Sequence, residues 1–274
     1  MIRRLVSKKK AFPIPIISVG NLLVGGTGKT PFVIALAKRY DAVAIISRGY
    51  GRQSKGLIEV SREGQILSSI EESGDEAMLM ALSLPNASVI VSENRVLAIE
   101  LAIREGAKVI LLDDAFSQVK MDKFEILLEP EKVYNFLPFP AGGFREFHFM
   151  KYYADIHLKE DRDFERKVSF ENLSSKMLLV TAIANPKRLD KYLPKGVIAK
   201  IYLDDHAYFE EENLKKALVL RGATSLLVTE KDAVKMKDFN LPLSLMKLEL
   251  SIEDKYFSII NKYIQRKRIS PNER

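Results

Sequence analysis

Residues 19–30 read Val-Gly-Asn-Leu-Leu-Val-Gly-Gly-Thr-Gly-Lys-Thr, and they join an apolar run to a helical pattern. The run at 14–19 predicts a buried strand, and the pattern at 30–40 predicts a helix. A glycine loop at such a junction lets backbone N–H groups turn toward phosphate oxygens. Its lysine then neutralises the β and γ oxygens, and its threonine ligates Mg²⁺. We therefore predict a site for a nucleotide triphosphate; an ordinary glycine turn is the alternative.

The predicted loop is a tight variant of the usual phosphate-loop motif. That motif is G-x-x-x-x-G-K-[ST], but Leu23 stands where its first glycine would be, and the order here is G-G-T-G-K-T. Thr30 is also the predicted ligand of Mg²⁺. The predicted phosphate ligands are Gly25, Gly26, Thr27, Gly28, Lys29 and Thr30.

The composition describes a chain without thiol chemistry and with an excess of positive charge. Its 274 residues are enough for two ordinary domains. It has no Cys, which excludes disulfides, cysteine zinc sites and thiol nucleophiles. The formal net charge of +7 suits nucleic acid, an anionic membrane face or a phosphorylated substrate, although simple solubility explains it equally well. No apolar run approaches the ~18 residues of a spanning helix.

The first half of the chain alternates short apolar runs with helical patterns. This alternation favours an α/β fold with a mainly parallel, doubly wound sheet like that of P-loop NTPases, whose ligands lie beyond the carboxyl ends of the strands. Strands are predicted at 14–19, 43–47, 87–91, 108–113 and 124–128, and helices at 30–40, 75–84 and 95–105.

The second half begins after a charged stretch at 159–167, which we interpret as a hinge or linker. We predict a phosphate-loop domain at 1–158 and a smaller α/β domain at 168–250. The remainder, 251–274, is expected to hold a terminal helix at 252–266 and a tail, and its domain is left open. The second βα series is expected at 177–181, 186–192, 197–203, 210–220, 225–229 and 243–250.

Two carboxylates end the predicted strand at 108–113. Asp113 and Asp114 offer the hard oxygen ligands that Mg²⁺ takes together with phosphates. A capping aspartate after a buried strand is the alternative, but the phosphate loop favours the metal. The loop at 47–52 follows another strand, and its glycines and arginines suit a phosphate or else form a solvated turn.

Other polar residues are candidates for catalysis. Asp75 lies at the start of a predicted helix. It could act as a base, as a metal ligand or, as the spacing favours, as a carboxylate that stabilises the helix start. His206 adjoins carboxylates, so it suits the orientation of a proton acceptor, although a lone surface histidine is the alternative. Lys231, at a predicted helix start, could reach an anion. His148 and His157 have no such setting and are interpreted as structural.

Nine motifs occur in a fixed order from residue 14 to about residue 250. They are SVGNLLVGGTGKTP at 18–31, SRGYGR at 47–52, GDE at 74–76, NR at 94–95, LDDAF at 112–116, PAGGFRE at 140–146, ANP at 184–186, DH at 205–206 and TEKDAVK at 229–235. With these motifs the chain resembles the tetraacyldisaccharide 4'-kinase family of lipid A biosynthesis. A phosphate loop alone would be weak evidence, whereas nine ordered motifs are specific.

The resemblance implies an ATP- and Mg²⁺-dependent kinase. Its substrate would be the 4'-hydroxyl of a tetraacylated glucosamine disaccharide 1-phosphate, at the cytoplasmic face of the bacterial inner membrane. Lys29 would serve the phosphates, and Asp75 would accept the proton of the sugar hydroxyl with support from His206. The implied metal ligands are Thr30, Asp113, Asp114 and Glu146, and the implied substrate contacts are Arg48, Tyr50, Arg95, Gln118 and Arg145.

The chain departs from the family pattern in two places. The family's Asp-Asp-Gly-Phe-Gln-His motif reads Asp-Asp-Ala-Phe-Ser-Gln at 113–118, so uncharged Gln118 replaces a histidine and Ser117 a glutamine. Family members also usually have a longer amphipathic N-terminal helix, whereas about a dozen residues precede the first predicted strand here. We therefore expect peripheral, electrostatic attachment to an anionic membrane surface. The basic candidates for this contact are Arg3, Arg4, Lys8, Lys9 and Lys10.

Two other classes of protein are less consistent with the residues. Deviant phosphate-loop ATPase switches of the partition or metallochaperone kind often begin K-G-G-x-G-K-T, and this chain has Val24 at the first position. A nucleic-acid-binding module would cluster its basic residues with exposed aromatic residues, whereas here they are dispersed. We expect a monomeric enzyme with a lipid substrate and no nucleic-acid partner.

Overall fold

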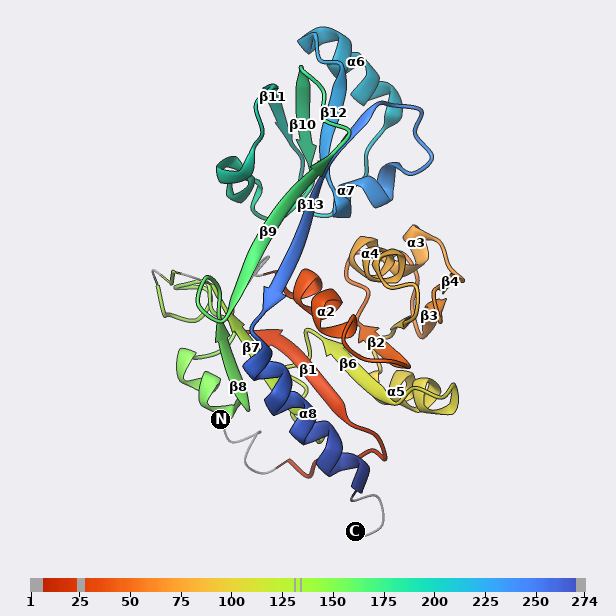
Figure 1. The fold of residues 1–274 in the computed structure, drawn as a ribbon, viewed down its shortest axis with the longest axis vertical. Coiled ribbons are helices and arrows are strands. Elements are labelled where there is room, and N and C mark those ends of the chain that lie inside the picture. The colour runs from red at the N-terminus through yellow and green to blue at the C-terminus, as the bar shows by residue number, and fades with distance from the viewer. Residues whose placement is uncertain (1–6, 24–27, 131, 134, 270–274) are drawn as a thin grey trace.

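The computed structural model describes residues 7–23, 28–130, 132–133 and 135–269, and its strands form two separate sheets (Figure 1). Neighbouring strands of the larger sheet run parallel from β5 to β8, and only β3 and β4 are antiparallel to their neighbours. The order is β4 (Gln65–Ile66), β3 (Ile58–Arg62), β5 (Ser88–Val91), β2 (Val43–Ser47), β6 (Val109–Asp113), β1 (Ile16–Asn21), β7 (Phe124–Glu129) and β8 (Ile156–Lys159).

Helices cover both faces of the larger sheet because alternate strand residues point to opposite sides. Ile17 of β1 shares a core with α2 (Lys29–Ala37), α4 (Asp75–Ser83) and α8 (Asp254–Ile269). Ile16, one residue earlier, lies in the opposite core with α5 (Arg95–Arg104). The terminal helix, whose domain the sequence left open, therefore packs on the larger sheet, where the Tyr263 hydroxyl donates to the Ile16 carbonyl at 3.0 Å.

The smaller sheet has its own cores on its two faces. One core contains Leu214 and Leu218 of α6 (Glu211–Arg221), and the other includes Tyr192 of the 3₁₀ helix η2 (Pro186–Tyr192). Only β9 is antiparallel to its neighbour. The order is β11 (Val197–Tyr202), β10 (Met177–Thr181), β12 (Ser225–Thr229), β13 (Leu243–Ile252) and β9 (Phe164–Glu171).

A long ribbon of β9 and β13 connects the two sheets (Figure 1). One end of the ribbon packs into the core of the larger sheet. There Phe164 lies edge-on against Phe32 of α2, with ring centroids 5.5 Å apart. The other end of the ribbon lies in the smaller sheet. The predicted linker at 159–167 is therefore not an irregular connection in its second part: β9 begins at Phe164 and is paired with β13 along its whole length, although Glu165 and Lys167 remain exposed.

The predicted α/β class, with a parallel sheet and a smaller second α/β region, is confirmed. Most predicted elements lie within two residues of those observed, because buried parallel strands have nearly continuous apolar sequences. Apart from β9, the elements that the sequence did not predict are short or irregular. The unpredicted elements are β3, β4, β8, β9, α3 (Ile70–Ser73) and the 3₁₀ helices η1 (His148–Tyr153) and η3 (Val234–Met236), the last of which follows the one-turn helix α7 (Glu230–Ala233).

Candidate active site

A cavity of about 1430 Å³ lies between the two sheets and is lined by residues of both. It gathers predicted residues that are far apart in sequence. Asp75 and Glu146 are not among its lining residues, and Gly25, Gly26 and Thr27 fall outside the described residues. The predicted residues that line it are Gly28, Lys29, Thr30, Arg48, Tyr50, Arg95, Asp113, Asp114, Gln118, Arg145 and His206.

The described part of the phosphate loop lies where the sequence predicts it, between β1 and α2. Gly28 caps the helix with φ 80° and ψ 27°, a left-handed conformation that favours glycine. Lys29 Nζ donates to Asn21 Oδ1 at 3.1 Å and lies 3.6 Å from Asp114 Oδ1. The lysine ammonium is thus held at the start of the helix, where backbone N–H groups favour an anion.

Asp113 stands at the carboxyl end of β6, between β1 and β2. The Ser47 hydroxyl donates to Asp113 Oδ2 at 3.1 Å, while Oδ1 is buried without a hydrogen-bond partner among the described residues. Burial, followed by the charges of Glu76 and Asp114, raises the pKa of Asp113 to about 7. A buried carboxylate oxygen without a partner in a phosphate-loop cavity fits a divalent cation, which would supply the missing charge.

Asp114 is the next residue, and cations surround it. Arg145 Nη1 donates to Asp114 Oδ2 at 2.7 Å. Burial raises the pKa of Asp114, but Lys29 and Arg145 outweigh burial and hold this pKa below its ordinary value. Within the described ranges no three His, Asp or Glu side chains form a preassembled metal site, so the predicted ligand set that includes Glu146 stays a prediction.

Asp75 and His206 meet across the two sheets, as the family motifs implied. His206 Nδ1 lies 2.9 and 3.0 Å from the two carboxylate oxygens of Asp75, and Lys235 Nζ is 3.5 Å from Oδ2. Burial opposes ionisation of Asp75, but the His206 hydrogen bond and nearby lysines lower its pKa. The same hydrogen bond outweighs burial and raises the pKa of His206. His206 lines the cavity, while Asp75 lies buried behind it.

Two lysines at this contact were underrated in the sequence. Lys231 Nζ lies 3.1 Å from Glu76 Oε1 and 3.8 Å from Asp75 Oδ2, so it joins α7 of the second sheet to α4 of the first. Lys235 also donates to the Ala207 carbonyl at 2.8 Å. The available signal was their i, i+4 spacing, which places both on one face of a helix.

The remaining predicted substrate residues have different settings. Arg48, Gln118 and Tyr50 are exposed, and the Tyr50 ring lies over His206 with centroids 5.2 Å apart. Arg95, in contrast, is buried and donates to the Ser92 and Asp113 carbonyls. Arg95 therefore supports the end of β6.

The two remaining histidines lie outside the cavity lining. His148 and His157 approach the two oxygens of Glu129 at 3.0 and 3.1 Å. The histidine hydrogen bonds lower the pKa of Glu129 to about 2. This cluster ties η1 and β8 to the end of β7.

Comparisons with known proteins show which family the chain resembles. The family model for tetraacyldisaccharide-1-P 4'-kinase matches residues 1–169 and 147–265. A tetraacyldisaccharide 4'-kinase of Helicobacter pylori (strain ATCC 700392 / 26695) is 51% identical over 96% of this chain and 84% of that protein. One of Aliarcobacter butzleri is 45% identical over 96% and 86%.

A solved structure shows the same fold. The LpxK of Aquifex aeolicus, crystallised in complex with ATP, superposes with a TM-score of 0.78 at 30% identity, covering 94% of this chain and 90% of that one. Its fold and the sequence relatives agree over nearly the whole chain. The chain therefore belongs to the tetraacyldisaccharide-1-phosphate 4'-kinase family.

Proposed function

We propose that this chain transfers the γ-phosphoryl group of ATP to the 4'-hydroxyl of a tetraacylated glucosamine disaccharide 1-phosphate. One observation carries the proposal beyond family membership. The Asp75–His206 pair is assembled across the two sheets at the same cavity as Lys29 and Thr30. Transfer to an alcohol requires a phosphate-loop site and a proton-accepting group at one cavity, and here the pair reaches the cavity through His206.

The first wall of the cavity, which the larger sheet and its loops form, would hold the nucleotide. Lys29 would neutralise the β and γ oxygens, with the backbone N–H groups of Gly28 and Thr30 at the helix start. Thr30, Asp113 and Asp114 would hold Mg²⁺, which neutralises phosphate charge when bound. The Oδ1 of Asp113, which has no hydrogen-bond partner among the described residues, supports this ligand set. Glu146 remains a proposal that rests on its motif alone.

The second wall is formed by the smaller sheet and its loops. The contact between the two walls would hold and deprotonate the acceptor. Asp75 and His206 would act as one pair, in which Asp75 is the base and His206 is the member that lines the cavity. Arg48 and Arg145 supply cations for the substrate 1-phosphate, and Tyr50 and Gln118 supply polar contacts. Arg95 would act indirectly, through its hydrogen bond to the Asp113 carbonyl.

The test is ATP consumption with and without the tetraacyl disaccharide 1-phosphate in detergent. We expect turnover only with the lipid acceptor and a product phosphorylated at the 4' position. A phosphate-loop ATPase switch would instead hydrolyse ATP at a rate that the acceptor leaves unchanged. That outcome, with intact ATP binding, would contradict the proposed acceptor.

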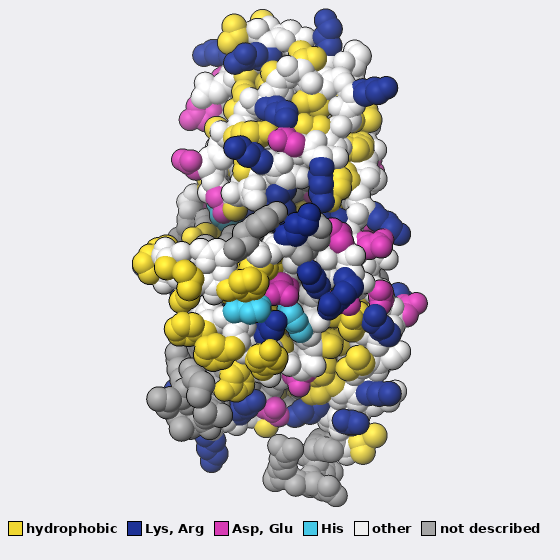
Figure 2. Space-filling model, turned by 90° about the vertical axis from the view of Figure 1, so that its left-hand side faces the viewer, with side chains coloured by type: hydrophobic (Ala, Val, Ile, Leu, Met, Phe, Trp, Pro, Cys, Tyr) yellow, Lys and Arg dark blue, Asp and Glu magenta, His cyan; other side chains and the backbone are white. Residues whose placement is uncertain are grey.

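We also propose that the protein attaches peripherally to the anionic cytoplasmic face of the inner membrane. No helix among the described residues is long and apolar enough to span a bilayer. Lys8 and Lys9 are exposed, while Lys10 pairs with Glu100 at 2.6 Å; Arg3 and Arg4 lie outside the described residues. Exposed apolar side chains also gather on one face (Figure 2). Several belong to one segment of the chain: Phe136, Leu137, Phe139, Phe147, Phe149 and Tyr152.

Vesicle sedimentation at several salt concentrations tests the electrostatic part of this attachment. Each lysine or arginine near an anionic leaflet contributes about 1 kcal/mol, which salt screens. Binding to anionic vesicles should therefore fall steeply with salt, and binding to neutral vesicles should stay weak. Tight, salt-insensitive binding to neutral vesicles that Phe139→Ser weakens would assign the anchoring to the apolar segment instead.

The domain limits remain a proposal. We propose a phosphate-loop domain at 1–158 and a smaller domain at 168–250, with the ribbon as their connection. Separate cores on the two sheets support the division, and the packing of α8 favours assigning 251–269 to the larger domain. We also propose a monomer without a nucleic-acid partner.

A further inference from the structure

A guanidinium group from the second sheet lies beside the phosphate loop. Arg166, near the start of β9, lines the same cavity as Lys29 and Thr30. Its side chain stands against Gly28: a Cβ built on that glycine would come within 3.1 Å of both Nη1 and Cζ, and Nη2 would be closer still. Gly28 is thus required both for its left-handed backbone and for the space that Arg166 occupies.

A buried carboxylate fixes the orientation of this arginine. Arg166 Nε donates to Glu160 Oε1, and Nη2 donates to Oε2 at 3.2 Å. The two side chains are only 8% and 5% exposed. Glu160 itself is held in the turn between β8 and β9 by a backbone hydrogen bond to Glu129 at 3.0 Å.

A second arginine approaches the same carboxylate. Arg188 of η2 lies 3.4 Å from Glu160, and it also lines the cavity. Burial and the charge of Arg166 lower the pKa of Arg188. The two guanidinium groups share one carboxylate, so an excess of positive charge remains, and an anion in the cavity that they and Lys29 line would balance it.

We propose that Arg166 binds the phosphate groups of the nucleotide, with Glu160 as the residue that positions it. This inference rests on the proposed ATP site and adds a ligand from the second sheet. A guanidinium group offers a planar fork of donors that matches phosphate oxygens, and Glu160 sets the plane of that fork. The contact would make the nucleotide a bridge between the two sheets.

The experiment compares ATP and inorganic tripolyphosphate as probes, by calorimetry with Mg²⁺ and without acceptor. Arg166→Lys is the main variant because it keeps a charge beside Glu160, and Arg166→Ala removes the group. We expect Arg166→Ala to weaken both probes by about 10- to 100-fold, the range for charge-assisted hydrogen bonds. Arg166→Lys should weaken the binding of both probes by a smaller factor, since lysine keeps the positive charge but lacks the planar set of guanidinium donors.

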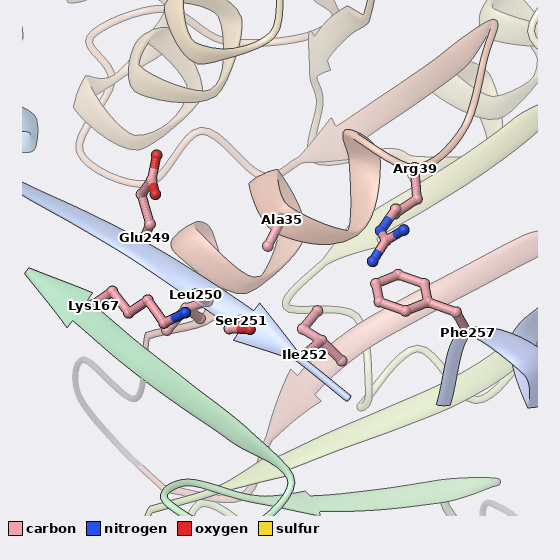
Figure 3. A pocket seen from close by; sticks show the side chains of 8 residues that line it. All are labelled: Ala35, Arg39, Lys167, Glu249, Leu250, Ser251, Ile252 and Phe257. Carbon is pink, nitrogen blue, oxygen red and sulfur yellow. The ribbon is translucent and has the colours of Figure 1, made fainter. Parts of the chain in front are cut away.

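Lys167→Ala is the matched control. Lys167 is the next cation along β9, but it does not line the large cavity; it lines a pocket of about 240 Å³ together with Arg39 and Phe257 (Figure 3). This variant should bind both probes as the wild type does. Unfolding temperatures measured without nucleotide confirm that all variants are folded.

Three outcomes would overturn the inference. They are unchanged affinity for both probes in Arg166→Ala, weaker ATP binding with unchanged tripolyphosphate binding, and an equal loss in Lys167→Ala. Failure of the proposed ATP site, on which this inference rests, looks different. In that case Lys29→Ala would bind ATP as tightly as the wild type, whatever Arg166 does.

Discussion

The two walls of the cavity are built in different ways. On the larger sheet, the site residues lie at or after strand ends: Lys29 begins the helix that follows β1, Arg48 follows β2, and Asp113 ends β6. On the smaller sheet, His206 lies in a loop after β11, Lys231 lies in the one-turn helix α7, and Arg166 lies within the ribbon. His206 and Lys231 also follow strand ends, those of β11 and β12, so the second wall differs in taking one site residue, Arg166, from within a strand.

The difference separates phosphate binding from assembly of the acceptor site. The first wall carries the phosphate loop and Asp113, and it keeps its geometry through the parallel sheet. Asp75 also belongs to the larger-sheet side, but its partners His206 and Lys235 come from the smaller-sheet side. Substitutions on the first wall should therefore affect nucleotide and metal, while those at the contact should affect proton transfer.

The largest effect is expected for Lys29→Ala. The described part of the loop would lose the ammonium that neutralises the β and γ oxygens, so turnover should fall to the acceptor-free background. Lys120→Ala, an exposed lysine outside the cavity, is the control and should retain activity. Wild-type turnover in Lys29→Ala would show that the nucleotide binds elsewhere.

Asp75→Asn should lower kcat by roughly 10²–10⁴-fold, as expected for loss of a general base. The KM for ATP should change little, because Asp75 lies behind His206 rather than at the loop. His206→Ala should act in the same direction. Because the pair works as a unit, the double variant should be much less damaging than the product of the single effects, and strict additivity would argue against a shared role.

Asp113→Asn and Asp114→Asn should each raise the Mg²⁺ concentration needed for half-maximal rate. A neutral amide is a weaker ligand than a carboxylate, and the shift should be roughly 10- to 100-fold. Mg²⁺ titrations at saturating ATP measure it. If both variants give the wild-type curve, the metal is held by other residues.

The smallest effect concerns the stability of the contact between the walls. Because the pKa of His206 is raised in the folded protein, its contribution to the free energy of unfolding is complete below about pH 6.5. This contribution is lost as pH rises through the folded-state pKa. The lowered pKa of Asp75 makes its contribution present above about pH 3.9 and lost as pH falls further. The pair should therefore stabilise most between about pH 4 and 6.5.

His206→Gln tests this pH dependence. At pH 6 the variant should unfold about 2–4 °C below the wild type, which corresponds to about 1 kcal/mol in a domain of 150–250 residues. The difference should shrink as pH rises well above neutral. Thermal melts across this range measure it, and a difference that grows with pH would reverse the assigned charge states.

Sequence patterns predicted most of the fold for two reasons. Strands buried on both faces are apolar runs, and helices with one buried face have apolar residues at helical spacing. The edge elements escaped this reasoning. Strand β9 has the burial alternation of a half-exposed strand, but its exposed residues are charged, so it reads as a linker. In the same way Lys231 reads as a helix-start residue until its partner Glu76 is seen 155 residues away.

By itself, the sequence determined the phosphate-binding half of this protein. Gly28, Lys29 and Thr30 are adjacent in the chain, and a strand that leads into a helix places them without help from distant residues. Only the tertiary structure decided the rest: that Lys231 and Lys235 flank the Asp75 carboxylate, and that Arg166 lies on Gly28. The physical reason is that these contacts depend on how the two sheets pack around one ribbon, and hydrophobic periodicity carries no information about which distant charges that packing brings together.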